Sequence, residues 1–287
     1  MIIDFHTHLF PKKIRDDRAL FFTNEPEFKL LYDSSRARMT GAEEIIAAMD
    51  QDGVDVSVIF GFPWRNPDTV RFHNDDILAA MARYPKRLKG FCCVDALNDG
   101  AYREVARCLD AGMSGVGELA FYQSGIEEEM LRRLQPIMAL CLEKDLPVMI
   151  HTNEPVGHSY PGKTPNTLAQ IYQIPKWFPH NKIVLAHWGG GVFFFLLLKK
   201  EVRETLTNVY YDTAASPFLY SPLIYQFAMR LAGREKCLFG SDYPLLKPGR
   251  YFGEMKEPAA GLSQEDLTAI CGLNAIRLLN MDRNVTS

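Results

Sequence analysis

Residues 1–11 read MIIDFHTHLFP, and this stretch decides which of two parallel folds the sequence favours. The apolar residues before His6 predict a short strand over 2–6. Residues i and i+2 of an extended chain point to the same face, so His6 and His8 leave the strand end side by side. Two neutral imidazoles in this position can bind one metal ion. The simpler interpretation is a strand whose histidines only reach the surface, so partners elsewhere in the chain must decide.

Short runs of apolar and β-branched residues alternate with longer amphipathic segments along almost the whole chain. The runs predict strands at 2–6, 54–60, 88–94, 113–118, 147–151, 182–187, 208–211 and 236–240. The segments predict helices at 41–52, 67–84, 102–111, 127–144, 164–178, 217–231 and 264–271. This alternation predicts parallel strands, either in one (β/α)8 TIM barrel or in a doubly wound open sheet. A doubly wound sheet usually has a glycine-rich turn after its first strand, and HTHLFP occupies that place, which favours the barrel.

The chain reads as one barrel domain over residues 1–287, because no internal repeat, low-complexity tract or linker divides it. Single α/β barrels commonly reach about 250 residues or more, which is compatible with this length. Residues 9–40 form a long first βα connection, and we expect it to cover the barrel mouth. Its aromatic residues Phe21 and Phe22 are expected to pack over the barrel or against a second subunit.

Composition and charge exclude several classes of protein. With 47% hydrophobic and 23% charged residues, the chain is typical of a globular protein with a substantial core. A net charge of −3 and a pI of about 6.2 give no general attraction for nucleic acid or anionic membranes. The N-terminus lacks the basic segment and cleavage site of a signal peptide, and the longest uniform apolar run, residues 192–198, is too short to span a bilayer.

The six cysteines contain no C-x-x-C pair and lie in apolar segments, which predicts buried free thiols and a cytoplasmic protein. The expected partner is a small molecule, with neither nucleic acid nor membrane. The oligomeric state is left open, a homo-oligomer being one alternative.

Side chains that bind metals or transfer protons follow five of the eight predicted strands. They are His6 and His8 after the first, Glu118 in GVGELAF after the fourth, His151 in PVMIHTNEP after the fifth, His187 in IVLAHWGGG after the sixth, and Asp242 in CLFGSDYP after the eighth. In a barrel these strand ends meet at one rim, where the active sites of this fold lie. The sequence therefore predicts a shared metal site.

Each of these residues also has a structural interpretation. An isolated histidine at a strand end is more often a hydrogen-bonded core residue, Asp242 would serve as a turn or helix cap, and Glu118 would pair with a basic neighbour. Their joint occurrence at the strand ends favours the metal site. His73 and His180 fall in helical or loop segments, and we expect both on the surface.

With these motifs in place, the sequence resembles the amidohydrolase superfamily, and within it the amidohydrolase-related (amidohydrolase 2) group. The resemblance extends over nearly the whole chain. It rests on the segments DFHTH (4–8), RFHNDDILAAMARYPKRLKGFCCVD (71–95), HWGGG (187–191), FGSDYP (239–244) and NAIRLL (274–279). The resemblance implies a TIM-barrel enzyme that depends on a divalent metal, with zinc as the expected ion.

The resemblance also implies a role for each residue of the predicted site. His6, His8, His151 and Asp242 would bind the metal. His187 would either bind a second metal or contact the substrate as an acid or electrostatic catalyst. Many binuclear relatives bridge two metals with a carboxylated lysine on strand 4, where this chain has Glu118. Glutamate is a metal ligand at that position in some relatives, notably TatD-type nucleases, and not in others. The number of metal ions, one or two, is therefore left open.

Hydrolysis is the leading functional hypothesis. A bound metal lowers the pKa of its water to about 7, Asp242 would take the proton, and His187 would stabilise the oxyanion of a small amide, lactone or ester. The alternative is a non-oxidative decarboxylase or hydratase acting on a small aromatic or unsaturated carboxylate, in which a proton is delivered to carbon. The complete ligand set argues against an inactive barrel, and the acidic charge balance argues against a nuclease.

Side chains on the connections after the strands are expected to line the pocket. They are Trp64, Arg65, Tyr122, Trp188 and, in the segment HTNEPVGHSYPGKTP (151–165), Glu154, His158, Tyr160 and Lys163. Arg65 and Lys163 are the candidates for holding an anionic group of the substrate. The tryptophans would alternatively only pack loops, and Lys163 would be a solvated charge.

Overall fold

Eight short parallel strands form the centre of the molecule. The computed structural model describes residues 1–123 and 125–281. The strands are β1 (Ile3–His8), β2 (Val56–Phe60), β3 (Leu88–Gly90), β4 (Val116–Leu119), β5 (Val148–Ile150), β6 (Ile183–Leu185), β7 (Val209–Asp212) and β8 (Cys237–Leu238). Each lies at a predicted position, although β3 and β4 are shorter than the apolar runs 88–94 and 113–118 that predicted them.

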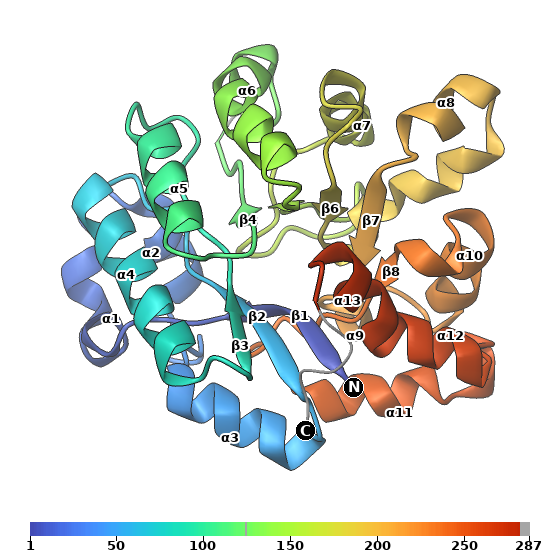
Figure 1. Ribbon diagram of the computed structural model, residues 1–287, viewed down its shortest axis with the longest axis horizontal. Helices are drawn as coiled ribbons and strands as arrows, with labels where there is room; N and C mark the ends of the chain where they lie inside the picture. The colour runs from blue at the N-terminus through green and yellow to red at the C-terminus, as the bar shows by residue number, and fades with distance from the viewer. Residues whose placement is uncertain (124, 282–287) are drawn as a thin grey trace.

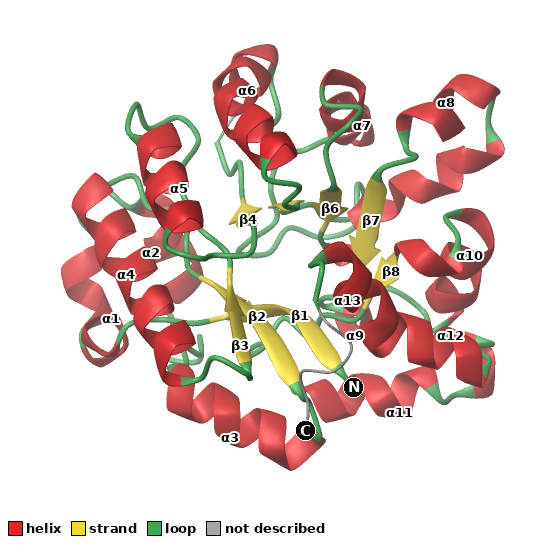
Figure 2. Ribbon diagram, viewed as in Figure 1, coloured by secondary structure: helices red, strands yellow, loops and turns green. Residues whose placement is uncertain are grey.

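The strands close into a ring through two seams. Strands β1 to β3 are hydrogen-bonded in one set and β4 to β8 in another. Between β3 and β4, the amide of Gly117 donates to Cys92 O (2.9 Å), and between β8 and β1 the amide of Phe5 donates to Phe239 O (2.7 Å). Figure 2 shows the resulting ring of strands inside a ring of helices. The predicted (β/α)8 barrel is confirmed.

Helices surround the strands on all sides (Figure 1). They are α3 (Ala42–Asp52), α4 (Pro67–Arg83), α5 (Ala101–Asp110), α6 (Glu128–Glu143), α7 (Leu168–Trp177), α8 (Lys200–Thr205), α9 (Ser216–Leu219), α10 (Leu223–Leu231), α11 (Pro248–Met255), α12 (Gln264–Thr268) and α13 (Asn274–Leu278). In α4, Asn66 caps the first turn by accepting from the amides of Asp68 (2.9 Å) and Thr69 (3.1 Å), with Pro67 at the first helical position. No helix in the described part of the chain combines the length and apolar character that a membrane crossing requires.

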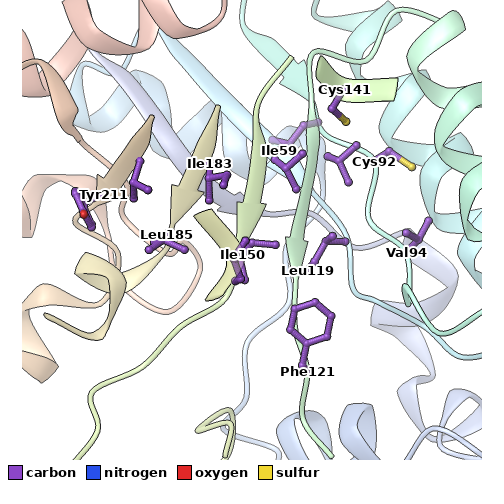
Figure 3. Close-up of a cluster of buried hydrophobic side chains, with 14 of the residues drawn as sticks. Ile59, Cys92, Val94, Leu119, Phe121, Cys141, Ile150, Ile183, Leu185 and Tyr211 are labelled. Carbon is purple, nitrogen blue, oxygen red and sulfur yellow. The ribbon is translucent and has the colours of Figure 1, made fainter. Parts of the chain in front are cut away.

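Two hydrophobic clusters hold the barrel together. The larger one lies between strands and helices, and Figure 3 shows part of it, with Ile59, Ile150 and Ile183 of the strands and Cys141 of α6. The smaller one packs side chains of six strands against α13 at residues 275–278. Each fully buried aliphatic or aromatic side chain contributes about 1.5–3 kcal/mol to folding. Because the smaller cluster fills the interior and α13 covers it, the open end of the barrel is the carboxyl end of the strands.

The structure corrects three sequence predictions. The connection 9–40 is not simply a loop, because it contains the helices α1 (Lys12–Asp16) and α2 (Pro26–Tyr32) and the 3-10 turn Arg18–Phe21. The predicted helix 217–231 is two helices, since the backbone is extended at Tyr220 and Pro222 disfavours helical geometry before it.

His73 is the third correction, because it is 1% exposed and not at the surface. Its Nε2 lies 2.6 Å from Leu9 O, and its Nδ1 accepts from the indole N–H of Trp64 (2.9 Å). Burial lowers the pKa of His73 to about 4, so the ring is neutral and serves the packing of α4 on the barrel. His180 is exposed, as predicted.

Candidate metal centre

An irregularity in β1 brings both histidines of the opening motif to the barrel interior. The strand continues to His8, beyond the predicted end at residue 6, and its pairing with β2 shifts between Asp4 and Thr7. Phe5 packs in the interior cluster, so a regular strand would direct His6 outward. The extra residue changes that direction, and the rings of His6 and His8 lie 5.2 Å apart.

Glu118 lies at the centre of four histidines. Its carboxylate oxygens are 2.9 Å from His151 Nδ1, 3.4 Å from His187 Nε2, 3.7 Å from His6 Nε2 and 3.8 Å from His8 Nε2. Glu118 is the last residue but one of β4 and is 6% exposed. Among the residues that the structure describes, Glu118 therefore lies with all four histidines and forms no ion pair with a lysine or arginine.

The outer nitrogen of three of these histidines is held by a hydrogen-bond acceptor. Nδ1 of His6 donates to Asp212 Oδ2 (2.8 Å), Nε2 of His151 donates to Gly162 O (2.9 Å), and Nδ1 of His187 donates to the carbonyl oxygen of Ala214 (3.0 Å). Each bond places a proton on the outer nitrogen and leaves the inner nitrogen facing Glu118. Acceptors in this position are typical of metal-binding histidines, because they set the tautomer and the ring orientation.

Asp212 is a functional residue that sequence reasoning missed. It ends β7, is fully buried, and accepts from the backbone amides of His187 (2.8 Å) and Ala214 (3.0 Å) with Oδ1 while Oδ2 accepts from His6. A single carboxylate thus orients residues of β1 and β6. The available signal was its place directly after the predicted strand 208–211, the same strand-end position that identified the other site residues.

Asp242 completes the cluster from the end of β8. Its Oδ1 lies 3.1 Å from His8 Nε2 and 3.6 Å from His6 Nε2. The backbone before it is anchored by buried Asp4, which accepts from the amide (2.9 Å) and the hydroxyl (2.5 Å) of Ser241. Burial raises the pKa of Asp4 to about 6. Asp4 was also missed, because its neighbours in sequence are apolar strand residues.

The segment HWGGG after β6 adopts a left-handed backbone. His187 has φ 55°, and Gly190 has φ 62°. A Cβ at Gly190 would lie 2.4 Å from Asn153 O, so glycine is required there by both the conformation and the space. This turn directs His187 toward the cluster, while Trp188 points away from it.

Carboxylates and imidazoles in the cluster shift the pKa values of one another. Burial alone would lower the pKa of His6 and His187, but Glu118 and, for His6, Asp212 raise them to about 10 and about 9. Burial likewise opposes ionisation of Glu118 and Asp242, yet the facing histidines hold both carboxyl pKa values well below their usual range. Without metal, the cluster therefore holds protons that a cation would displace.

The donor set fits a divalent metal ion. His6 Nε2 is buried and has no hydrogen-bond partner among residues 1–123 and 125–281, which is costly for a polar atom unless an ion or water binds it. Three overlapping triplets have donor atoms within 4.8 Å of one another: His6, His8 and Glu118; His6, His187 and Asp242; and Glu118, His151 and His187. Mixed imidazole and carboxylate donors suit zinc and manganese, and the overlap of the triplets allows one or two ions.

A cavity of about 880 Å³ opens above the cluster. Apolar and aromatic side chains form much of its wall, with Phe62 and Tyr122 stacked at a centroid distance of 6.2 Å. Of the predicted pocket residues, Tyr122, Glu154, His158 and Tyr160 line it. It is also lined by Arg36 and Arg38 from the first connection, which sequence reasoning missed although that connection is rich in charge.

Arg65 and Lys163 do not line the cavity, contrary to prediction. The guanidinium of Arg65 pairs with Glu27 and lines a separate small pocket, while Lys163 Nζ pairs with Glu154 Oε1 at 2.6 Å. Glu27 belongs to helix α2, which is distant from Arg65 in sequence, whereas Glu154 lies nine residues before Lys163 on the same connection.

The two predicted tryptophans are also absent from the cavity wall. Trp188 is fully buried, donates from Nε1 to Ser216 Oγ (2.5 Å) and packs edge-on against Tyr225. Trp64 is fully buried against Phe28 of α2, at 4.2 Å between ring centroids. Both tryptophans therefore pack against residues of helices, and neither lines the cavity.

The fold and this site together define a class of metal-dependent TIM-barrel enzyme. A family model described as Amidohydrolase matches residues 3–281. The chain belongs to the amidohydrolase family, which confirms the resemblance seen in the sequence.

Several solved structures share the fold over nearly the whole chain. A 5-carboxyvanillate decarboxylase from Sphingomonas paucimobilis is 17% identical with a TM-score of 0.76, over 98% of this chain and 99% of that one. A dihydroxybenzoic acid decarboxylase from Polaromonas, with bound manganese and the inhibitor 2-nitroresorcinol, is 18% identical with a TM-score of 0.69, over 100% and 99%. A 5-carboxyvanillate decarboxylase from Novosphingobium aromaticivorans, complexed with manganese and 4-hydroxy-3-methoxy-5-nitrobenzoic acid, is 17% identical with a TM-score of 0.76, over 98% and 96%. At these identities the likeness shows a common barrel fold.

Proposed function

We propose that this protein is a metal-dependent, non-oxidative decarboxylase of a small aromatic carboxylate. The observation that carries the proposal is the cavity, whose aromatic and apolar wall stands over a cluster able to hold a metal. The stacked rings of Phe62 and Tyr122 and the apolar side chains of Phe218, Leu219 and Leu245 suit a flat aromatic ring. Three similar solved structures are decarboxylases of aromatic acids, which supports this reading over hydrolysis.

The residues of the site have defined tasks in this reaction. His6, His8, His151, Asp242 and Glu118 would hold the metal, which supplies positive charge for substrate oxygens when it is bound. The apolar wall removes water from the carboxylate, whose compact charge loses more hydration than the spread charge of the transition state. The bond between ring carbon and carboxylate carbon breaks, CO2 leaves, and the electron pair stays on the ring carbon.

A proton must then reach that carbon. His187 and Asp242 are our candidates to deliver it, because both line the cavity beside the cluster. His187 is the stronger candidate for the donor. Its outer nitrogen already donates to Ala214 O, so its Nε2 alone faces the cavity side of the cluster.

Hydrolysis of a small amide, lactone or ester is the second candidate function. It is favoured by the two triplets that share Glu118, since paired metal sites commonly activate water. In that reaction Asp242 would accept the proton of the attacking water and His187 would stabilise the oxyanion.

We infer that zinc or manganese is the physiological metal. The imidazole-rich donor set favours zinc, and manganese is the ion found in two of the similar structures. We also infer a cytoplasmic enzyme, a reading supported by six free cysteines, five of them buried.

The test separates the two reactions by their products. Purified protein, loaded with zinc or manganese, is incubated with a panel of hydroxybenzoates and other aromatic carboxylates, and with lactones and esters. We expect CO2 release that a chelator abolishes and that either metal restores. Acid release from lactones or esters without CO2 would reject decarboxylation in favour of the second candidate.

Variants assign the proton donor. His187→Asn should lower CO2 release by about 10²–10⁴-fold, the usual effect of losing a general acid. His180→Asn is the matched control, because His180 is exposed and outside the site. Retention of full activity in His187→Asn, with Asp242→Asn inactive, would move the donor role to Asp242.

A further inference from the structure

Two arginines at the cavity rim are not used by the proposed reaction. Arg36 and Arg38 lie on the loop between α2 and α3, are exposed, and line the same cavity as the metal cluster. Neither guanidinium has a carboxylate or carbonyl partner among residues 1–123 and 125–281. Two cations that share one cavity without counter-charges create a local positive potential.

Other cations around the barrel mouth differ from this pair. Arg65 is neutralised by Glu27, and Lys163 by Glu154. Of the carboxylates that line the cavity, Glu118 and Asp242 lie in the metal cluster and Glu154 is bound to Lys163 and to the hydroxyl of Tyr160 (2.8 Å). None of these three carboxylates therefore neutralises the positive charge of Arg36 and Arg38.

The loop that carries the two arginines is held in place by hydrogen bonds to its backbone. The guanidinium of Arg18 donates to the carbonyl oxygen of Tyr32 at the end of α2 (3.1 Å) and to those of Ser34 (3.3 Å) and Ala37 (2.9 Å) in the loop. The amide of Ala37 also donates to Ser34 O (3.0 Å). A backbone fixed in this way has less freedom to lose when a ligand binds, which favours affinity.

We propose that Arg36 and Arg38 form an anion-binding subsite at the rim, so that the substrate is an aromatic dianion. One carboxylate would lie at the metal cluster, as the proposed function requires, and the second anionic group would lie at the arginines. The planar guanidinium matches a carboxylate with two parallel hydrogen bonds. A volume of about 880 Å³ is large among small-molecule cavities of about 300–1,000 Å³, which leaves room for a substituent beyond one ring.

The test compares two ligands that differ in one charge. Isothermal titration calorimetry on the metal-loaded protein measures isophthalate and its monomethyl ester, which have the same ring. We expect isophthalate to bind at least about tenfold more tightly, because a charged hydrogen-bonded pair forms only with the dianion. Added salt should reduce this preference, since the rim is exposed.

Two double variants make the test specific. Arg36→Gln/Arg38→Gln should abolish the preference for isophthalate while leaving binding of the ester within about twofold of wild type, and Arg36→Lys/Arg38→Lys should retain part of it. The control Arg71→Gln/Arg103→Gln removes the same charge from exposed residues of α4 and α5 outside the cavity, and should change neither affinity. Equal isophthalate affinity in wild type and in the rim variant would reject the subsite.

The subsite and the proposed reaction can fail separately. If the rim variant loses the dianion preference but no aromatic acid releases CO2, then the subsite stands and decarboxylation is wrong. If CO2 is released from monoanionic acids and the rim variant handles dianions like wild type, then decarboxylation stands and the subsite is wrong.

Discussion

Replacing Asp212 by asparagine tests whether the cluster is organised by its outer hydrogen bonds. In the native site Oδ2 accepts from His6 Nδ1, and Oδ1 accepts from the amides of His187 and Ala214. An asparagine that keeps its oxygen toward the two amides presents its NH2 group to His6 Nδ1. That nitrogen must then accept, so the ring proton moves to Nε2 and the metal-facing lone pair is lost. If the asparagine amide is flipped instead, its NH2 group faces the backbone N–H groups of His187 and Ala214, and donors then face donors.

Either orientation therefore costs one buried hydrogen bond or more, and both weaken the metal site. Loss of a partner that orients a ligand histidine typically lowers metal affinity or activity by about 10 to 100-fold. This corresponds to about 1.4–2.8 kcal/mol of binding free energy. We expect Asp212→Asn to weaken metal binding as well as to destabilise the fold, because Asp212 is hydrogen-bonded directly to His6, a candidate metal ligand.

Metal affinity is measured by competition with a chromogenic chelator at pH 8, for wild type, Asp212→Asn and the control Asp110→Asn, whose carboxylate is exposed on the outer surface. Thermal unfolding with and without metal separates folding from binding: the metal-induced rise in Tm should shrink only in Asp212→Asn. A folded Asp212→Asn protein with wild-type metal affinity would refute the assigned role of Asp212.

Three further predictions concern the metal, pH and the backbone. Elemental analysis should find one or two metal ions per chain, and Glu118→Gln should remove one equivalent if Glu118 bridges two ions, or weaken affinity by about 10 to 100-fold if it only supports a ligand. The pKa values of His6 and His187 are raised from 6.5 to about 10 and about 9 in the metal-free protein, so their stabilising contribution is complete below pH 6.5 and lost as pH rises toward 10. Urea unfolding in chelator at pH 7 and pH 9.5 should show this loss, and metal binding should strengthen over the same range. Gly190→Ala should destabilise by about 1–3 kcal/mol, whereas Gly253→Ala, with open space around its Cβ, should not lower Tm.

The hydrophobic periodicity of the sequence was sufficient to predict the barrel, because each strand and helix is encoded by its own residues. His8 is the last residue of β1 and Asp242 lies shortly after β8. Because the strands are parallel and the barrel closes, all of their carboxyl ends meet at one rim. This is why residues as far apart as His6 and Asp242 could be assigned to one site. Helix ends were less predictable. The apolar pattern of residues 217–231 continues without a break, but the backbone is extended at Tyr220 and divides the segment into two helices.

The sequence by itself determined the order of elements and the identity of the strand-end donors, because hydrophobic period and residue type are properties of short segments. Only the tertiary structure decided which side chains face the cavity. The shifted pairing of β1 turns His6 inward, and the carboxylate of Glu27 in α2 neutralises Arg65, while Arg36 has no charged partner within the described residues. Charge pairing and side-chain direction depend on neighbours that are distant in sequence, so they appear only once the chain has closed on itself.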